Sequence, residues 1–283
     1  MNIRLNLIGT VAAVLLVGCA PTSAQSQAEV VAAEQVVRLP ASAGRELEVR
    51  VWAASNPTVV VVFSAGGGGQ PAAYERMMRA LAQEGFTVIA PVHDDALARG
   101  DISGSGGPAS FISRLEDLAI ARGYAGATHS GLPLVVMGHS FGSLMSSLAI
   151  GASTPVGVQS DPGVKALVAF SSPGIIPGLM TPDTYRNLSA PVLVVTGDHD
   201  VVPGFVTEWR SHRALYDHSS VPGSALVIVP EADHNLVVSA DDATFSAVVD
   251  LTATFIRAEA LGDAAARARL SRIEISGATI ERR

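Results

Sequence analysis

Cysteine, lysine and charged residues are scarce in this 283-residue chain, and each shortage excludes a class of function. Cys19 is the single cysteine, so the chain can form neither an internal disulfide nor a cluster of thiolate metal ligands. Lys165 is the single lysine, and it does not belong to a Gly-Lys-Ser/Thr loop of the kind that binds nucleotide phosphates. Charged residues make up 16% of the chain and the net charge is −7, whereas nucleic-acid binding calls for a basic surface. We therefore expect no nucleic-acid partner.

Residues 1–18 have the pattern of an export signal. Arg4 precedes an uncharged apolar run over 5–17, which is shorter than the roughly 20 residues that span a bilayer. The run ends in Leu-Val-Gly-Cys at Cys19, which resembles the lipobox of bacterial lipoproteins. An ordinary secretory signal that happens to hold a cysteine is the alternative.

The lipobox resemblance implies that the mature chain begins at an acylated Cys19 and is anchored to a membrane. Residues 19–34 are rich in alanine, serine and glutamine, and we expect them to form a tether. No aspartate follows the cysteine closely, in contrast to many lipoproteins that stay at the inner membrane. We therefore expect a location in the cell envelope, on the outer membrane and facing the periplasm.

Between residues 35 and 261, β-rich runs alternate with helical patterns. We expect strands at 35–39, 47–53, 57–64, 86–92, 132–137, 166–170, 191–196 and 225–229. We expect helices after Pro71 and over 110–122, 141–150, 207–217 and 241–258. This alternation predicts one α/β domain with a doubly wound, mostly parallel sheet flanked by helices. Residues 262–283 form a charged, weakly patterned tail, for which we expect a peripheral helix or strand.

Residues 138–142, with the sequence Gly-His-Ser-Phe-Gly, fit the Gly-x-Ser-x-Gly pattern. The predicted strand 132–137 precedes them and the predicted helix 141–150 follows, which is the context of a nucleophile elbow. Glycines allow a turn so tight that the serine takes a strained backbone conformation. We expect Ser140 to be a nucleophile, and a plain turn into a helix is the alternative.

A serine hydroxyl needs a histidine that takes its proton and a carboxylate that orients the histidine. His234 lies on the loop after the predicted strand 225–229, at the carboxyl edge of the sheet, and we expect it to be the base. The other histidines after Ser140 are expected in a loop or on the solvated face of a helix: His199, His212 and His218.

Two aspartates, Asp198 and Asp200, follow the predicted strand 191–196, where the acid should lie. The clusters at 93–95 (His-Asp-Asp) and 198–200 (Asp-His-Asp) could also ligate a hard divalent cation. The serine, histidine and acid account for the second cluster without a metal, so we expect neither a metal nor a cofactor.

The backbone N–H of Phe141, directly after the nucleophile, is the expected first donor to an oxyanion.

Over about residues 35–258 the chain resembles the α/β-hydrolase superfamily. Residues 138–142 and 86–93 resemble dienelactone-hydrolase-like and platelet-activating-factor-acetylhydrolase-like serine esterases. The turn 197–200 resembles the Gly-x-x-Asp turn of the superfamily, which implies Asp200 as the acid and Asp198 as the second choice. Residues 65–67, Ala-Gly-Gly, stand where relatives often have His-Gly-x, which implies Gly67 as the second oxyanion donor. Dienelactone hydrolase proper uses a cysteine nucleophile, so that specific activity is not implied.

Together these features predict a serine hydrolase that cleaves carboxylic esters through an acyl-enzyme intermediate. The 20 residues of segment 171–190 leave room for a small lid at most, which favours short- or medium-chain acyl groups. Hydrolysis of amide or carbon–carbon bonds uses the same apparatus. A non-catalytic periplasmic lipoprotein with the fold as a binding module is a further alternative. We expect a small-molecule ester as the partner, a membrane contact through the lipid anchor alone, and a monomer.

Overall fold

The computed structural model describes residues 34–97, 107–155, 157 and 159–283. The predicted export signal, Cys19 and almost all of the predicted tether lie outside the described residues, so these predictions stay predictions. The first described strand begins at Glu34, one residue before the expected start of the domain.

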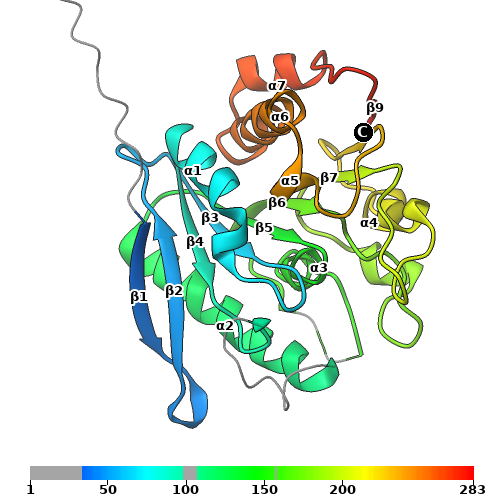
Figure 1. The fold of residues 1–283 in the computed structure, drawn as a ribbon. Coiled ribbons are helices and arrows are strands. Elements are labelled where there is room, and N and C mark those ends of the chain that lie inside the picture. Colours follow the sequence, from blue (N-terminus) through cyan, green and yellow to red (C-terminus); the bar gives the residue numbers. More distant parts are fainter. Residues whose placement is uncertain (1–33, 98–106, 156, 158) are drawn as a thin grey trace, which may run out of the picture. The chain divides into compact units, whose positions relative to one another are not determined.

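One mixed sheet organises the described part of the chain (Figure 1). Within that part, its nine strands follow the order β1-β2-β4-β3-β5-β6-β7-β8-β9. The strands from β4 to β8 run parallel, whereas β1, β2 and β9 pair antiparallel with their neighbours. The predicted doubly wound, mostly parallel sheet is thereby confirmed. The strands are β1 (Glu34–Pro40), β2 (Glu46–Trp52), β3 (Val59–Ser64), β4 (Phe86–Pro91), β5 (Leu134–His139), β6 (Val164–Phe170), β7 (Val192–Gly197), β8 (Ala225–Val229) and β9 (Thr279–Arg282).

Helices cover both faces of the sheet (Figure 1). β3 is buried along its whole length, and its alternate side chains enter two separate apolar clusters. A parallel strand that is buried on both faces is apolar without alternation, which explains the unbroken run of valines. One cluster contains side chains of α1 (Glu75–Gln83), α5 (Leu236–Ser239), α6 (Asp242–Ala260) and α7 (Ala264–Leu270). The other contains side chains of α2 (Gly107–Thr128), α3 (Phe141–Leu148) and α4 (Ala214–Asp217).

The segment 207–217 differs from the single helix that its pattern predicts. It consists of a 3-10 turn, η5 (Trp209–Arg213), followed by the one-turn helix α4. His212 belongs to the 3-10 turn, and its exposed fraction is 0%. The prediction that His212 lies on a solvated face is therefore wrong, whereas His218 is exposed as expected.

The tail 262–283 forms both elements that its pattern left open, the helix α7 and the strand β9. β9 pairs antiparallel with β8 and extends the sheet. Between β6 and β7, the chain forms only the short 3-10 turn η4 (Pro182–Tyr185), in agreement with a small lid or none. Among the helices that the structure describes, none combines the length and the apolar character needed to cross a membrane.

Candidate active site

Ser140 lies at the sharp turn between β5 and α3. Its backbone has a φ of 51° and a ψ of −123°, outside the regions that residues with side chains prefer. The glycines of the motif make this turn possible. A Cβ atom on Gly138 would overlap the backbone of Gly142, and a Cβ atom on Gly142 would overlap the backbone of Ser64. The turn thus holds Ser140, which is partly exposed, at the start of α3.

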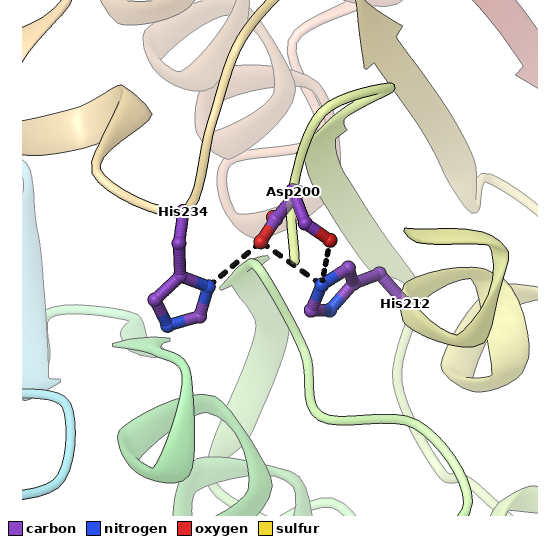
Figure 2. A group of neighbouring side chains, drawn as sticks. All are labelled: Asp200, His212 and His234. Atoms are coloured by element: carbon purple, nitrogen blue, oxygen red, sulfur yellow. Dashed lines mark hydrogen bonds and ion pairs between the residues drawn. The ribbon is translucent and has the colours of Figure 1, made fainter. Parts of the chain in front are cut away.

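Asp200 and His234, the expected acid and base, contact each other at the same edge of the sheet (Figure 2). Asp200 is buried, and its Oδ1 accepts a hydrogen bond from Nδ1 of His234 over 2.7 Å. Its Oδ2 accepts a hydrogen bond from the Thr196 hydroxyl over 2.8 Å. Because Nδ1 faces the carboxylate, Nε2 is the nitrogen of His234 that can exchange a proton with another group.

The loops after β7 and β8 pack against each other, and this contact brings Asp200 close to His234. Gly197 ends β7, and a Cβ atom there would overlap the backbone of Ala232 on the neighbouring loop. Asp198, the alternative acid, accepts a hydrogen bond from the backbone N–H of Glu231 over 2.6 Å and so ties the two loops together. His199 is exposed, as expected for a loop residue.

A second histidine reaches the same carboxylate. Nε2 of His212 lies 2.9 Å from Oδ1 of Asp200, on the side opposite His234 (Figure 2). Hydrogen bonds from His212 and His234 lower the pKa of Asp200 well below its usual range, although burial opposes this shift. Sequence reasoning missed His212, because a helical pattern over 207–217 gave no reason for it to point inward.

Gly67 and Phe141, the expected oxyanion donors, lie next to each other. A Cβ atom on Gly67 would be 3.9 Å from Cβ of Phe141. Phe141 begins α3, so its N–H is one of the first-turn donors for which a helix provides no acceptor. The Gly66 carbonyl accepts a hydrogen bond from Nη2 of Arg114 over 2.9 Å. Since a trans peptide points its C=O and N–H in opposite directions, the Gly67 N–H faces away from Arg114.

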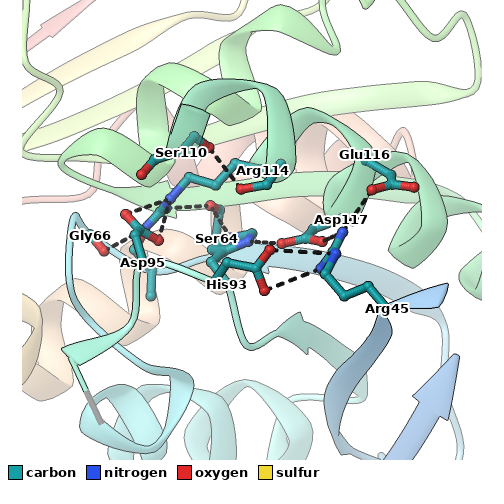
Figure 3. Close-up of polar contacts among 12 residues, drawn as sticks. Arg45, Ser64, Gly66, His93, Asp95, Ser110, Arg114, Glu116 and Asp117 are labelled. Atoms are coloured by element: carbon teal, nitrogen blue, oxygen red, sulfur yellow. Dashed lines mark hydrogen bonds and ion pairs between the residues drawn. The ribbon is translucent and has the colours of Figure 1, made fainter. Parts of the chain in front are cut away.

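Arg114 binds the backbone of this loop (Figure 3). Its exposed fraction is 0%, and it donates to the Ala65 carbonyl over 2.6 Å as well as to Gly66. The carboxylate of Asp95 accepts hydrogen bonds from Nε and Nη2 of Arg114 and balances its charge. The guanidinium also lies 4.7 Å from the ring centre of Phe141. One buried cation therefore contacts both segments that carry the expected oxyanion donors.

A second set of buried groups continues from Arg114 (Figure 3). Both ring nitrogens of His93 form hydrogen bonds. Nε2 lies 2.9 Å from the Ser64 hydroxyl, and Nδ1 lies 2.8 Å from Oδ2 of Asp117. Arg45 lies 2.7 Å from the other oxygen of Asp117. Burial, reinforced by the charge of Arg114, lowers the pKa of His93 to about 4. The alternative reading of residues 93–95 as metal ligands therefore gains no support, since His93 and Asp95 are occupied by these partners.

The comparisons with known proteins agree with this architecture. Neither a protein-family model nor a curated protein matches the chain. Among solved structures, the chain is similar to the esterase domain of a Rhodothermus marinus protein, with 18% identity, a TM-score of 0.58, and coverage of 81% of this chain and 99% of that one. It is similar to a thermostable carboxyl esterase from Bacillus coagulans, with 15% identity, a TM-score of 0.63, and coverage of 80% and 99%. It is similar to dienelactone hydrolase from Anabaena variabilis, with 18% identity, a TM-score of 0.60, and coverage of 81% and 98%.

The chain has the α/β-hydrolase fold. Within this α/β-hydrolase fold, the elbow and the loop that carries His234 are directly connected. His139 precedes Ser140, and its Nε2 donates a hydrogen bond to the backbone carbonyl of His234 over 2.8 Å. Its Nδ1 accepts from the Tyr74 hydroxyl over 2.8 Å, and that hydroxyl accepts from the Gly66 N–H over 3.2 Å. Burial, helped by the neighbouring His234, lowers the pKa of His139 to about 4, so the ring is neutral at neutral pH.

Asp200, His212 and His234 are the described residues whose donor atoms lie close enough together to suggest a metal ion. Ligands of one zinc ion bind it at about 2.0–2.2 Å each in a tetrahedron, which separates them by more than a hydrogen-bond length. Here both imidazoles contact the carboxylate directly, over 2.7 and 2.9 Å. The cluster is thus a hydrogen-bonded set in which both histidines share the carboxylate of Asp200.

Arg114 is the second residue that sequence reasoning missed, although the sequence carries a signal for it. Phe111, Arg114 and Leu118 follow the i, i+3, i+7 spacing of the buried face of a helix. A charged residue at an apolar-face position of α2 indicates a buried partner, which here is Asp95.

Proposed function

We propose that the chain is a serine hydrolase that cleaves carboxylic esters through an acyl-enzyme intermediate. The observation that carries the proposal is the backbone of Ser140, whose φ of 51° is made possible by flanking glycines. Such strain persists only where the surrounding structure imposes it, and it clusters at catalytic turns. The hydrogen bond between Asp200 and His234 at the same sheet edge adds a base whose orientation is fixed.

In the proposed reaction, the Ser140 hydroxyl oxygen attacks the acyl carbon and its proton passes to Nε2 of His234. Asp200 holds the ring through Nδ1 and stabilises the positive charge that forms on it. The N–H groups of Phe141 and Gly67 donate to the oxyanion of the tetrahedral intermediate. His234 then returns the proton to the leaving alcohol. A water molecule, deprotonated by His234 in turn, hydrolyses the acyl-enzyme and releases Ser140.

The apolar side chains around this sheet edge favour an apolar acyl group. Exposed hydrophobic residues follow the carboxyl ends of several parallel strands. They are Leu97 after β4, Ile175 after β6, and Val201 and Phe205 after β7, and Phe205 is 89% exposed. The short segment between β6 and β7 supports a short or medium acyl chain, because only η4 could cover a ligand there.

Trapping with a fluorophosphonate probe tests the proposed function. We expect the wild-type chain to be labelled covalently and Ser140→Ala to remain unlabelled, because the probe reacts with an activated serine. Ser271→Ala is the matched control, since Ser271 is an exposed serine at the end of α7, and it should label like the wild type.

Two outcomes contradict the proposal. Labelling that persists in Ser140→Ala rejects this serine as the nucleophile. A folded wild-type chain that does not label favours the alternative, a lipoprotein that uses the fold as a binding module. A panel of esters with different acyl lengths, assayed alongside the corresponding amides, then defines the substrate preference.

We further propose that the enzyme is anchored to the outer membrane through acylated Cys19 and faces the periplasm. The support is the apolar run that ends at the single cysteine. Cys19→Ser is expected to move the protein from the membrane fraction to the soluble fraction, because a chain without acyl groups loses its membrane affinity. Unchanged recovery in the membrane fraction would argue against lipidation.

A further inference from the structure

Both ring nitrogens of His212 face hydrogen-bond acceptors, and Figure 2 shows those that belong to Asp200. Nδ1 lies 2.5 Å from the backbone carbonyl oxygen of Ser172. Nε2 lies 3.0 Å from the backbone carbonyl oxygen of Asp200 and 2.9 Å from Oδ1 of the same residue. The side chain of His212 is fully buried, so water cannot replace any of these partners.

Backbone carbonyl oxygens accept hydrogen bonds and never donate them. A neutral imidazole has one N–H, so one of its nitrogens would point a lone pair at a carbonyl oxygen across a hydrogen-bond distance. This conflict arises whether Asp200 is ionised or protonated, because both ring nitrogens face a carbonyl of the main chain. Only the doubly protonated ring satisfies all three acceptors.

We propose that His212 is a buried imidazolium and acts as a positioning residue. It shares the Asp200 carboxylate with His234 and so weakens the attraction of that carboxylate for a proton on the catalytic histidine. The proposal rests on the proposed function for the role of His234, whereas the charge of His212 follows from its contacts alone. The acid at this site is therefore held between two imidazoles, from η5 on one side and from the loop after β8 on the other.

The charges around His212 are consistent with this assignment. Asp200 lies on the loop after β7, the His234 ring centre lies 6.0 Å away, and the neutral ring of His139 ends β5. The arginines beside it in the chain have other partners, because Arg210 pairs with Glu208 and Arg213 pairs with Asp217 and Glu281. Burial opposes the charge on His212, but its hydrogen bond to Asp200 raises the pKa above the ordinary value.

The sharing of Asp200 has a chemical consequence. In a triad with one histidine, the full charge of the acid favours a proton on that histidine. A second cation about 6 Å away opposes this protonation, by an amount that corresponds to about two pH units at the effective dielectric constant of about 20 that applies near a protein surface. The charge of His212 therefore offsets part of the attraction that Asp200 exerts on a proton of His234.

Two measurements test the inference. In the wild-type chain, a long-range ¹H–¹⁵N spectrum is expected to show both ring nitrogens of His212 protonated at about pH 7, where an ordinary histidine is mostly neutral. In His212→Asn, the acidic limb of the pH profile of kcat/KM is expected to move upward by about two pH units. His218→Asn is the matched control, because His218 is an exposed histidine six residues further on, and its profile should stay unchanged.

A neutral His212 in the wild-type spectrum overturns the inference, and so does an unshifted acidic limb in a folded His212→Asn variant. A role in packing alone would lower stability without moving the limb. If the variant does not fold, the wild-type spectrum still decides. Failure of the proposed function can be distinguished from failure of this inference. If a fluorophosphonate probe does not label the wild-type chain, the proposed function fails, but the protonation state of His212 can still be measured.

Discussion

His234→Ala is expected to lower kcat/KM for an ester substrate by about 10⁴- to 10⁶-fold, the range that follows the loss of a triad histidine in serine hydrolases. Without the imidazole, no group accepts the proton of Ser140 during attack, and none returns it to the leaving alcohol. Steady-state kinetics with a chromogenic ester measures the loss.

His199→Ala is the control for this loss. His199 belongs to the same pair of joined loops, but it is exposed, so its variant should keep a kcat/KM close to that of the wild type. The opposite ranking of the two variants would show that the base is wrongly assigned. Circular dichroism separates a chemical loss from an unfolded variant, since His234 is only partly buried and its removal should leave the sheet intact.

Arg114→Met is expected to destabilise the protein by about 3–5 kcal/mol, because it leaves the charge of Asp95 without its buried partner. It also removes the donors to the Ala65 and Gly66 carbonyls, so the Gly67 N–H loses its fixed direction. The loss of one oriented oxyanion donor typically costs about 10²- to 10³-fold in kcat. Denaturant unfolding and ester kinetics on the folded fraction measure the two effects.

Two further variants separate stability from catalysis. Arg122→Met removes another largely buried arginine of α2, which pairs with Asp161 and not with the oxyanion loop, so only stability should fall. The double variant Arg114→Met with Asp95→Leu removes the unpaired charge and is expected to regain part of the stability but not kcat. If folded Arg114→Met retains the wild-type kcat, the arginine does not orient the donor.

Strand positions and the sheet class could be predicted because they depend on local patterns. The valine run of β3 and the alternation of strands with helical stretches are visible without any knowledge of contacts. The loops that carry Asp200 and His234 could be chosen because the carboxyl ends of parallel strands meet at one edge, whatever lies between them. The choice of Asp200 over Asp198 rested on the resemblance of the turn 197–200 to that of the superfamily. The prediction of a single helix over 207–217 was wrong because the pattern of this segment does not distinguish a 3-10 turn from an α-helix.

The remaining parts of the site depend on contacts between distant residues. Arg114 reaches Ala65 and Gly66, which lie 49 and 48 positions earlier in the chain. His212 turns inward because a carboxylate 12 positions earlier and a carbonyl 40 positions earlier face its ring. Such pairs leave no periodic trace in a single sequence. Only the misplaced charge on the apolar face of α2 hints at one of them.

The hydrogen bonds of His139 leave its ring without a free acceptor for the proton of Ser140. The set begins at the Gly66 N–H and ends at the His234 carbonyl, and neither backbone group can exchange the roles of donor and acceptor. Tyr74 and His139 must therefore point their hydrogens in one direction only. The lone pair of Nδ1 is occupied by the tyrosine, and Nε2 carries the only ring proton. Although His139 adjoins the serine in the chain, it offers no vacant lone pair, so a rival route for the hydroxyl proton is closed.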